Sequence, residues 1–386
     1  MKILVAHNQY QGRGGEDVVF DAETALLREA GHQVETLTVS NHAINSLASR
    51  VAATLSVVDS RFGRQAIGEA IERHRPDVVH VHNFFPRLSP AIFDVCRQFG
   101  VPAVATLHNY RTICSGGMLL RNGRVCHECL DAGDQIRGII HRCYRASYVG
   151  SAASAWMITS HKRRGTWTRP GIRFIALTEF ARDLFARSGF DADTIDVKPN
   201  FLPDPGEPDG AARREGLLFV GRLSPEKGVD DLICAAATAG VPLRIAGGGP
   251  EHERLRREAG PNVTFLGEIS RTEVLREMST TRALVVPSRW YEGFPMVVVE
   301  AFARGTPVLA SRLGALAEII RDRETGALNP PGNIAALASN IAEFAGDHAL
   351  ADRCGRSARQ TYLSRYTPHA NLRLLEAIYR RAQHSS

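Results

Sequence analysis

Residues Leu217–Gly228 read LLFVGRLSPEKG, the pattern of a buried strand, a glycine turn and the start of a helix. Gly221 and Arg222 follow the carboxyl end of this strand, and Lys227 stands close to the start of the helix. The pattern recurs at Leu243–Ala246, where the strand is followed by Gly-Gly-Gly-Pro. Strands that alternate in this way with helices predict βαβ units and a parallel sheet.

The same alternation runs through both halves of the chain. Between the halves, the segment 198–208 contains four prolines, which neither a helix nor a central strand accommodates. We therefore expect an α/β fold of two Rossmann-like parallel-sheet domains, over residues 1–200 and 210–365, with a helix at 366–386 that packs back on the first domain. The predicted strands are Ile3–Ala6, Val34–Val39, Asp77–Val81, Ala103–Leu107, Phe174–Leu177, Leu217–Val220, Leu243–Ala246, Val263–Leu266, Ala283–Val286 and Val308–Ala310.

Composition places the chain among ordinary globular proteins. It has 386 residues, of which 44% are apolar and 23% charged. No stretch approaches the ~20 apolar residues of a membrane span. The N-terminus has only four consecutive apolar residues before His7, too few for the core of a signal peptide. We expect a cytoplasmic protein.

The positive charge of the chain is concentrated in a basic insert at 111–170. Between Arg111 and Arg173 there are eleven Lys or Arg residues and three Asp or Glu residues, whereas the whole chain has a net charge of +6. This indicates an anionic partner, such as a lipid diphosphate or the anionic surface of the membrane, on which the protein would be peripheral. The alternative is a solvated basic loop. Interleaved aromatic residues typical of a nucleic-acid groove are lacking.

Four of the seven cysteines lie in this insert with the spacing C-x11-C-x2-C-x13-C. Two thiols at C-x2-C spacing and two further thiols could complete a tetrahedral structural zinc site. Unliganded thiols packed in the fold are the main alternative, and a redox dithiol is another. The four candidate ligands are Cys114, Cys126, Cys129 and Cys143.

Two features of the first domain are candidates for binding. Gly14 and Gly15 stand in a glycine-rich turn before a helix, where the backbone could approach a phosphate or a substrate. The turn is not a dinucleotide fingerprint, because the third glycine position is Asp17, and it could also be a plain βα turn. His108 follows the strand Ala103–Leu107, at the edge where open α/β sheets bind ligands.

The second domain has the stronger candidates. Arg222 and Lys227 at a helix start suit a diphosphate, since the helix dipole adds to their charge. Residues 292–300 read EGFPMVVVE. With Pro295 as the first helical residue, Glu300 lies roughly 7.5 Å further along the axis. The two glutamates could therefore contact different parts of one extended ligand.

These residues, together with the Gly305-Thr-Pro-Val that follows the two glutamates, resemble the retaining glycosyltransferases of family 4, including a bacterial polysaccharide-biosynthesis type. The resemblance implies the GT-B fold, two Rossmann-like domains facing a central cleft, with the acceptor bound by the first domain and a UDP-, GDP- or ADP-sugar by the second. It implies that a hexosyl group is transferred to a saccharide or lipid-linked hydroxyl with retention of anomeric configuration. The implied catalytic residues are Glu292, His108, Arg222 and Lys227; the donor would be bound by Gly221, Gly248, Gly249, Phe294, Pro295, Met296, Val297 and Glu300, and the acceptor or phosphate side by Gly14 and Gly15.

We expect no cofactor to be required for the transfer, because the two cations could stabilise the leaving diphosphate and no DxD-like metal motif stands near them. Two other activities remain as alternatives. A GT-B sugar-nucleotide epimerase would use the same donor without an acceptor. A NAD-dependent oxidoreductase is disfavoured by the incomplete glycine fingerprint.

Overall fold

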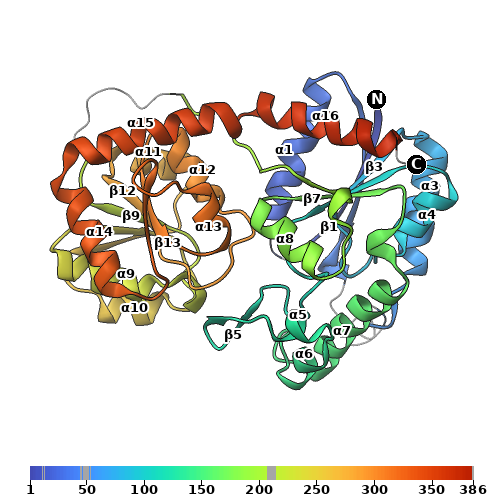
Figure 1. The fold of residues 1–386 in the computed structure, drawn as a ribbon, viewed down its shortest axis with the longest axis horizontal. Coiled ribbons are helices and arrows are strands. Elements are labelled where there is room, and N and C mark those ends of the chain that lie inside the picture. The colour runs from blue at the N-terminus through green and yellow to red at the C-terminus, as the bar shows by residue number, and fades with distance from the viewer. Residues whose placement is uncertain are drawn as a thin grey trace. The chain divides into compact units, whose positions relative to one another are not determined.

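The computed structural model describes residues 1–10, 12, 14–43, 46, 52, 54–206 and 214–384. The chain divides into two compact units (Figure 1). The first comprises residues 1–119, 126–199 and 371–386, and the second comprises residues 120–125 and 200–370. The predicted strands each overlap an observed strand, and the predicted α/β fold with two parallel sheets is confirmed.

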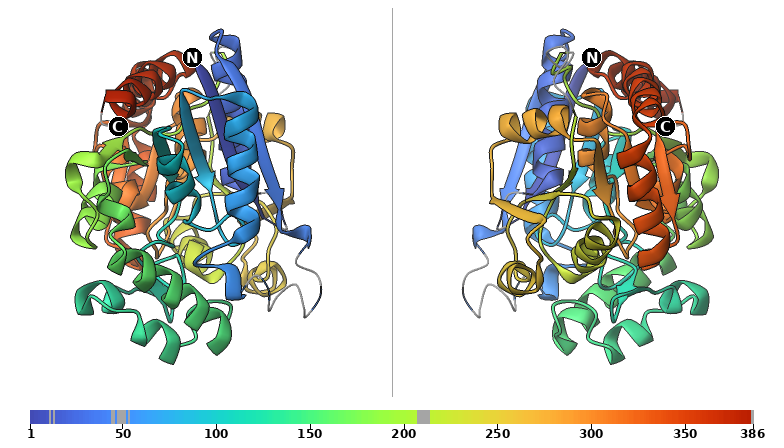
Figure 2. Two further views of the ribbon diagram at one scale, coloured as in Figure 1. Left: turned by 90° about the vertical axis from the view of Figure 1, so that its right-hand side faces the viewer. Right: turned by 90° about the vertical axis from the view of Figure 1, so that its left-hand side faces the viewer.

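The first unit is built on a six-stranded parallel sheet of order β2-β1-β3-β4-β7-β8. Helices cover its strands (Figure 2, left). Its core joins Ile3 and Val5 of the sheet to Phe20 and Leu27 of α1 and to Tyr379 of the last helix. The strands are β1 (Lys2–Gln9), β2 (Gln33–Ser40), β3 (Val78–Asn83), β4 (Ala103–Leu107), β7 (Ile172–Ala176) and β8 (Ile195–Val197). The helices are α1 (Gly15–Glu29), η1 (Asn41–Ala43), α3 (Arg61–His74), α4 (Ile92–Gln98), α8 (Glu179–Arg187), η3 (Ala192–Thr194) and α16 (Pro368–His384).

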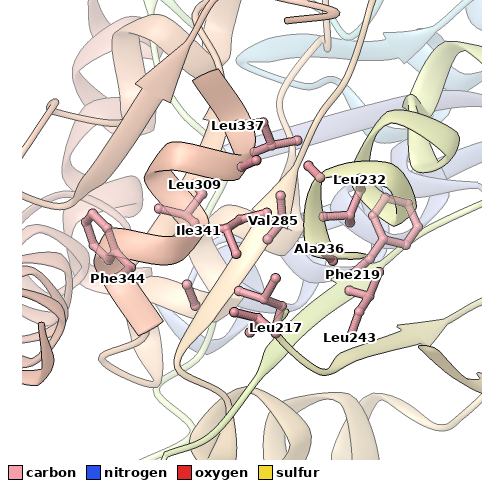
Figure 3. Close-up of a cluster of buried hydrophobic side chains, with 14 of the residues drawn as sticks. Leu217, Phe219, Leu232, Ala236, Leu243, Val285, Leu309, Leu337, Ile341 and Phe344 are labelled. Atoms are coloured by element: carbon pink, nitrogen blue, oxygen red, sulfur yellow. The ribbon is translucent and has the colours of Figure 1, made fainter. Parts of the chain in front are cut away.

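The second unit is built on another six-stranded parallel sheet, of order β11-β10-β9-β12-β13-β14. Apolar side chains of its strands, such as Leu217 and Val285, pack against Leu232 of α9 and Ile341 of α14 (Figure 3). The strands are β9 (Leu217–Val220), β10 (Leu243–Ala246), β11 (Val263–Gly267), β12 (Ala283–Val286), β13 (Val308–Ser311) and β14 (Gly326–Asn329). The helices are η4 (Pro225–Lys227), α9 (Val229–Ala239), α10 (His252–Glu258), α11 (Arg271–Thr280), α12 (Met296–Ala303), α13 (Gly314–Ile319), α14 (Ile334–Gly346) and α15 (His348–Arg365).

The segment 111–170, expected to be irregular, has regular structure of its own. It contains a two-stranded antiparallel hairpin and four short or medium helices. Its elements are β5 (Leu120–Arg121), β6 (Arg124–Val125), α5 (Glu128–Ala132), α6 (Ile136–Ile140), α7 (Tyr148–Arg163) and η2 (Thr166–Thr168).

The predicted helix at 366–386 overlaps α16, and a separate helix, α15, precedes it. The chain forms α15 and α16, with Tyr366 as the residue that ends α15 and Pro368 as the first residue of α16. Proline cannot continue a helix, and it disfavours the helical conformation in the residue before it. Residues 371–386 group with the first unit. The segment 198–206 has no helix or strand, and Glu207 and Pro208 of the predicted linker lie outside the described residues.

None of the helices described in the structure is both long enough and apolar enough to cross a lipid bilayer.

Candidate functional site

The second sheet places two loops side by side at the point where its strand order reverses. Strand β9 pairs with β10 on one side and with β12 on the other. The connections that leave β9 and β12 therefore diverge, and open α/β sheets bind ligands at such a reversal, beyond the carboxyl ends of the strands. Arg222 and Lys227 follow β9, and Glu292 follows β12. Topology thus brings three of the predicted site residues to one edge.

Glu292 is the most strongly bound of these side chains. Its Oε1 atom lies 2.8 Å from Nζ of Lys227 and accepts hydrogen bonds from Oγ of Ser288 (2.6 Å) and Nε1 of Trp290 (3.1 Å). Lys227 also lies over the Trp290 ring, 5.4 Å from its centroid. All three donors contact the same oxygen. Within the described part of the chain, Oε2 of Glu292 accepts no hydrogen bond, so this oxygen is available to a ligand.

Arg222 contrasts with this bound pair. Its side chain is exposed and makes no ion pair or hydrogen bond with any other described residue. The acids at the start of α9 do not neutralise it, because Asp230 and Asp231 pair with Arg289 at 3.1 and 2.5 Å. A free guanidinium beside a half-buried lysine suits a phosphate ligand.

The glycines of this unit hold the loops at close range. A Cβ atom on Gly247 would lie 2.0 Å from the carbonyl oxygen of Gly221, and one on Gly249 would lie 2.4 Å from that of Leu223. Leu223 N–H donates to the carbonyl of Gly248 at 2.8 Å. The loops after β9 and β10 therefore pack backbone against backbone. This gives Gly249 a structural reason beside the predicted contact with a donor, whereas a Cβ atom on Gly248 would meet the Glu268 side chain at 2.6 Å.

Glu300 lies in the first turns of α12 and is the fifth residue of that helix. Its Oε1 atom lies 3.3 Å from Nε of Arg271, and its side chain is 15% exposed. Burial raises the pKa of this carboxyl above its ordinary value, although Arg271 acts in the opposite direction. The helix is anchored by Val298, Val299 and Ala301, which are fully buried.

The start of α12 differs by one residue from the prediction. Pro295 precedes the helix as its N-cap, and Met296 is the first helical residue. The backbone N–H groups of Met296 and Val297 therefore belong to the first turn, which lacks intrahelical partners. The ring of Phe294, a predicted donor contact, packs edge-on against Tyr366 with 6.0 Å between the centroids.

In the first unit, His108 follows β4 and is partly exposed. Its Nε2 atom lies 3.1 Å from Nδ1 of His82. Burial of the ring lowers the pKa of His108 to about 3, although Glu23 acts in the opposite direction. This imidazole is therefore neutral at pH 7 and can exchange hydrogen bonds but cannot supply a positive charge.

In the glycine turn of the first unit, a side-chain carboxylate of the protein itself already accepts a backbone hydrogen bond. Gly14 caps α1, and its N–H donates to Oδ2 of Asp17 at 2.7 Å, while Oδ1 of Asp17 lies 2.8 Å from Nε2 of His7. A Cβ atom on Gly15 would meet no heavy atom within 4 Å. Gly15 thus borders open space. The nearby Asp17 carboxylate disfavours a phosphate, so this geometry weakens the predicted phosphate contact but not the predicted contact with a substrate.

A buried polar cluster lies beneath these residues. The Glu23 carboxylate pairs with the Lys198 ammonium, and these side chains are only 1% and 0% exposed. Oε2 of Glu23 lies 3.4 Å from Nε2 of His82. The two nitrogens of His80 each lie 2.8 Å from a hydroxyl, of Tyr379 and of Thr106. Burial lowers the pKa of both His80 and His82 well below the ordinary value.

Among the described residues, this cluster is also the one set of three side chains whose metal-ligand atoms lie within 4.8 Å of one another, namely Glu23, His80 and His82. It does not fit a metal ion. Lys198 already supplies the positive charge, and both nitrogens of His80 already have hydroxyl partners.

The chain also resembles known proteins. Residues 14–200 match the family model "Glycosyl transferase 4-like domain", and residues 209–361 match "Glycosyl transferases group 1". The structure is similar to sucrose-phosphate synthase from Thermosynechococcus elongatus, with a TM-score of 0.74 and 20% identity over 100% of both chains. The chain has the GT-B fold of glycosyltransferases.

Two further similarities extend this result. Anabaena HepE in complex with UDP-glucose has the same GT-B fold, with a TM-score of 0.66 and 17% identity over 98% of this chain and 99% of that one. Glycogen synthase of Mycobacterium tuberculosis is 30% identical over 304 residues, which are 75% of this chain. The chain spans 65% of the length of that relative.

In this GT-B chain the structure does not support the predicted zinc site. No three of Cys114, Cys126, Cys129 and Cys143 bring their sulfur atoms within 4.8 Å of one another, and none of the four forms a disulfide. Burial raises the pKa of the Cys129 thiol to about 11, so this thiol is protonated at neutral pH. The sequence pattern supplied enough thiols for a zinc site, but it did not show how far apart their sulfur atoms lie in the fold.

Sequence reasoning missed several residues of the candidate site. Ser288 and Trp290 bind the catalytic candidate Glu292, and Arg271 pairs with Glu300. The position of Trp290, two residues before Glu292, was a usable signal. Arg271 gave none, because it stands 29 residues from its partner in the sequence.

Proposed function

We propose that this protein is a retaining glycosyltransferase of family 4, which transfers a sugar from a nucleotide-sugar donor to an acceptor hydroxyl. The observation that carries the proposal is Glu292 at the reversal of the second sheet, bound through one oxygen by Lys227 and open at the other. The match of both halves to glycosyltransferase family models supports it.

In this proposal the diphosphate of the donor binds Arg222 and Lys227. The leaving diphosphate gains negative charge as the glycosidic bond breaks, so fixed cations stabilise the transition state more than the ground state. Arg222 is exposed and without a partner in the described chain, which is consistent with this role. Lys227 contacts Glu292 as well, and it would thus connect the phosphate to the sugar.

The two glutamates would bind the two ends of the donor. Oε2 of Glu292 would accept hydrogen bonds from hydroxyls of the sugar. Glu300 would accept them from the ribose, in place of its ion pair with Arg271. The N–H groups of Met296 and Val297 in the first turn of α12 would donate to the sugar or the phosphate.

The first unit would bind the acceptor, for which we propose a saccharide or lipid-linked saccharide in the synthesis of a cell-surface polysaccharide. His108 would contribute hydrogen bonds as a neutral imidazole, since its pKa lies far below 7. Gly15 borders open space and would allow close approach of the acceptor. Attack would occur on the same face of the sugar as the leaving diphosphate, which preserves the anomeric configuration.

A transfer assay tests the proposal. The purified chain is incubated with UDP-, GDP- and ADP-sugars and saccharide acceptors, release of nucleoside diphosphate is measured, and the anomeric configuration of the product is read by NMR. We expect one donor class to support transfer with retention and Glu292→Gln to lose at least ~100-fold in kcat/KM. Glu324→Gln, an exposed pair partner of Arg321, is the matched control. An inverted product contradicts retention, and full activity of Glu292→Gln contradicts the site.

A further inference from the structure

The insert carries an exposed surface that none of the residues above explains. From Gln135 to Thr178 the chain contains eight Lys or Arg residues and no Asp or Glu. The same region holds five of the twelve large apolar side chains that are exposed in the described structure, although it is a small part of the chain. These five are Ile136, Ile140, Tyr148, Val149 and Trp156.

Helix α7 separates its residues cleanly between two faces. Ser151, Ser154, Ile158 and His161 are buried and recur at helical spacing on the inner face. The outer face carries Val149, Trp156 and Arg163, each seven residues apart and all exposed. Val149 is 67% and Trp156 50% exposed. Met157, Ile158 and Trp167 are buried and do not belong to this outer face.

Helix α6 carries two more of these exposed apolar side chains. It packs against α7 (Figures 1 and 2), and its residues Ile136 and Ile140, four apart, are 61% and 59% exposed. Arg142 lies 5.4 Å above the ring of Tyr148. We call the outward side chains of α6 and α7 the insert face.

Several positive charges beside the insert face have no acidic partner within the described chain, although Arg137 of α6 lies 4.0 Å from Glu128. Arg169 and Arg173 pair with Asp94 and Asp196. In contrast, none of the following forms an ion pair with another described residue: Arg142, Arg145, Lys162 and Arg163. Exposed apolar side chains among unpaired cations match an anionic bilayer, which offers phosphate groups at its surface and hydrocarbon just below.

We propose that the insert face docks this protein on a membrane surface that contains anionic phospholipid. Trp156, Val149, Ile136 and Ile140 insert among the headgroups, and Lys162, Arg163, Arg142 and Arg145 contact lipid phosphates. The docking depends on the surface alone, so it can be measured separately from glycosyl transfer.

Sedimentation of the full chain with vesicles tests this proposal. We compare two kinds of vesicle. One contains phosphatidylcholine with about 30 mol% phosphatidylglycerol, which gives a strong negative surface charge. The other contains phosphatidylcholine alone. We expect binding to the anionic vesicles only, weakened by salt. Lys162→Ser/Arg163→Ser should reduce partitioning about 25-fold, at roughly fivefold for each lost charge. Trp156→Ser should reduce it at least ~10-fold.

Matched controls come from the second unit. Leu363 on α15 is 47% exposed, and Arg356 on the same helix is exposed without a partner in the described chain. Leu363→Ser and Arg356→Ser should bind like the wild-type chain. Circular dichroism verifies that each variant is folded. Absence of binding to anionic vesicles at low salt, equal binding to neutral vesicles, or unchanged binding by both insert-face variants would each overturn the proposal. Such a result would instead favour a protein partner for the insert face.

Discussion

The two parallel sheets treat the charges at their carboxyl ends in opposite ways. In the first unit, Glu23 and Lys198 are enclosed, and the imidazoles around them are neutral. In the second unit, Glu292 keeps one oxygen open and Arg222 is exposed and unpaired among the described residues. The comparison teaches that ionised groups near the carboxyl ends of a parallel sheet can either stabilise the fold or remain available to a ligand. The following predictions test that division.

The largest expected effect comes from breaking the buried pair of the first unit. Lys198→Met leaves the Glu23 carboxylate without its cation, and breaking such a buried pair costs ~3–5 kcal/mol of unfolding free energy. Lys227→Met should cost only about 1–2 kcal/mol, because Glu292 keeps Ser288 and Trp290 as donors. Urea denaturation measures both.

The double variant Glu23→Gln/Lys198→Met is the control for that measurement, since it removes both charges together and should recover part of the loss. Equal destabilisation by Lys198→Met and Lys227→Met would remove the distinction between the two units.

The next effect concerns sugar transfer, in which the cations of the second unit are expected to matter most. Lys227→Met and Arg222→Ala should each lower kcat/KM for sugar transfer by roughly 100-fold, because each removes a cation from the developing charge of the diphosphate. Arg256→Ala, an exposed arginine of α10, should transfer sugar like the wild-type chain. Steady-state kinetics with the active donor decides; loss of activity confined to Arg256→Ala would place the phosphate elsewhere.

Acid should destabilise the first unit before the second. Burial lowers the pKa of His80 and His82 in the folded state, so the unfolded state binds more protons below pH ~6.5. Their contribution to stability is present above that pH and is lost as the pH falls, by about 1.4 kcal/mol for each imidazole at pH 5.5. Denaturation midpoints at pH 7.5 and 5.5 measure it.

Tryptophan fluorescence can assign that loss to a unit. Trp156 and Trp167 belong to the first unit and Trp290 to the second. The variant Trp290→Phe therefore reports on the first unit alone. An identical midpoint at both pH values in this variant would refute the expected acid sensitivity.

The smallest effect concerns Glu300. Its raised pKa means that the folded state binds the proton more readily than the unfolded state, so the ionised carboxylate reduces stability at high pH. Glu300→Gln should raise the melting temperature without nucleotide by roughly 1–3 °C at pH 8, with a smaller gain toward pH 4.5. Glu324→Gln should show no gain. A lower melting temperature for Glu300→Gln at pH 8 would contradict this account.

The fold was predictable because each strand is a short apolar run with turn residues on both sides. Parallel strands buried on both faces have this form, and β9, β10 and β12 coincide with their predicted ranges. Strands β8 and β14 were missed. IDV has only three residues with an aspartate at its centre, and GALN begins with Gly326, where a Cβ atom would lie 1.8 Å from the carbonyl of Val308. Close packing selects that glycine, and propensity alone argues against a strand there.

The site was predictable where residues follow strand ends and obscure where partners are distant in the sequence. Arg222, Lys227 and Glu292 were found because they border β9 and β12. Lys198 looked like part of a polar linker, and its partner Glu23 stands 175 residues away. Only the folded chain brings such pairs together.

The central claim, that the second unit binds a nucleoside diphosphate through Arg222 and Lys227, is tested most directly by calorimetric titration with UDP, GDP and ADP. We predict that one of the three binds the wild-type chain and Arg256→Ala equally well, and binds Arg222→Ala/Lys227→Met at least ~100-fold more weakly. Binding of that nucleotide to the double variant with wild-type affinity, or binding of none of the three to the wild-type chain, would contradict it.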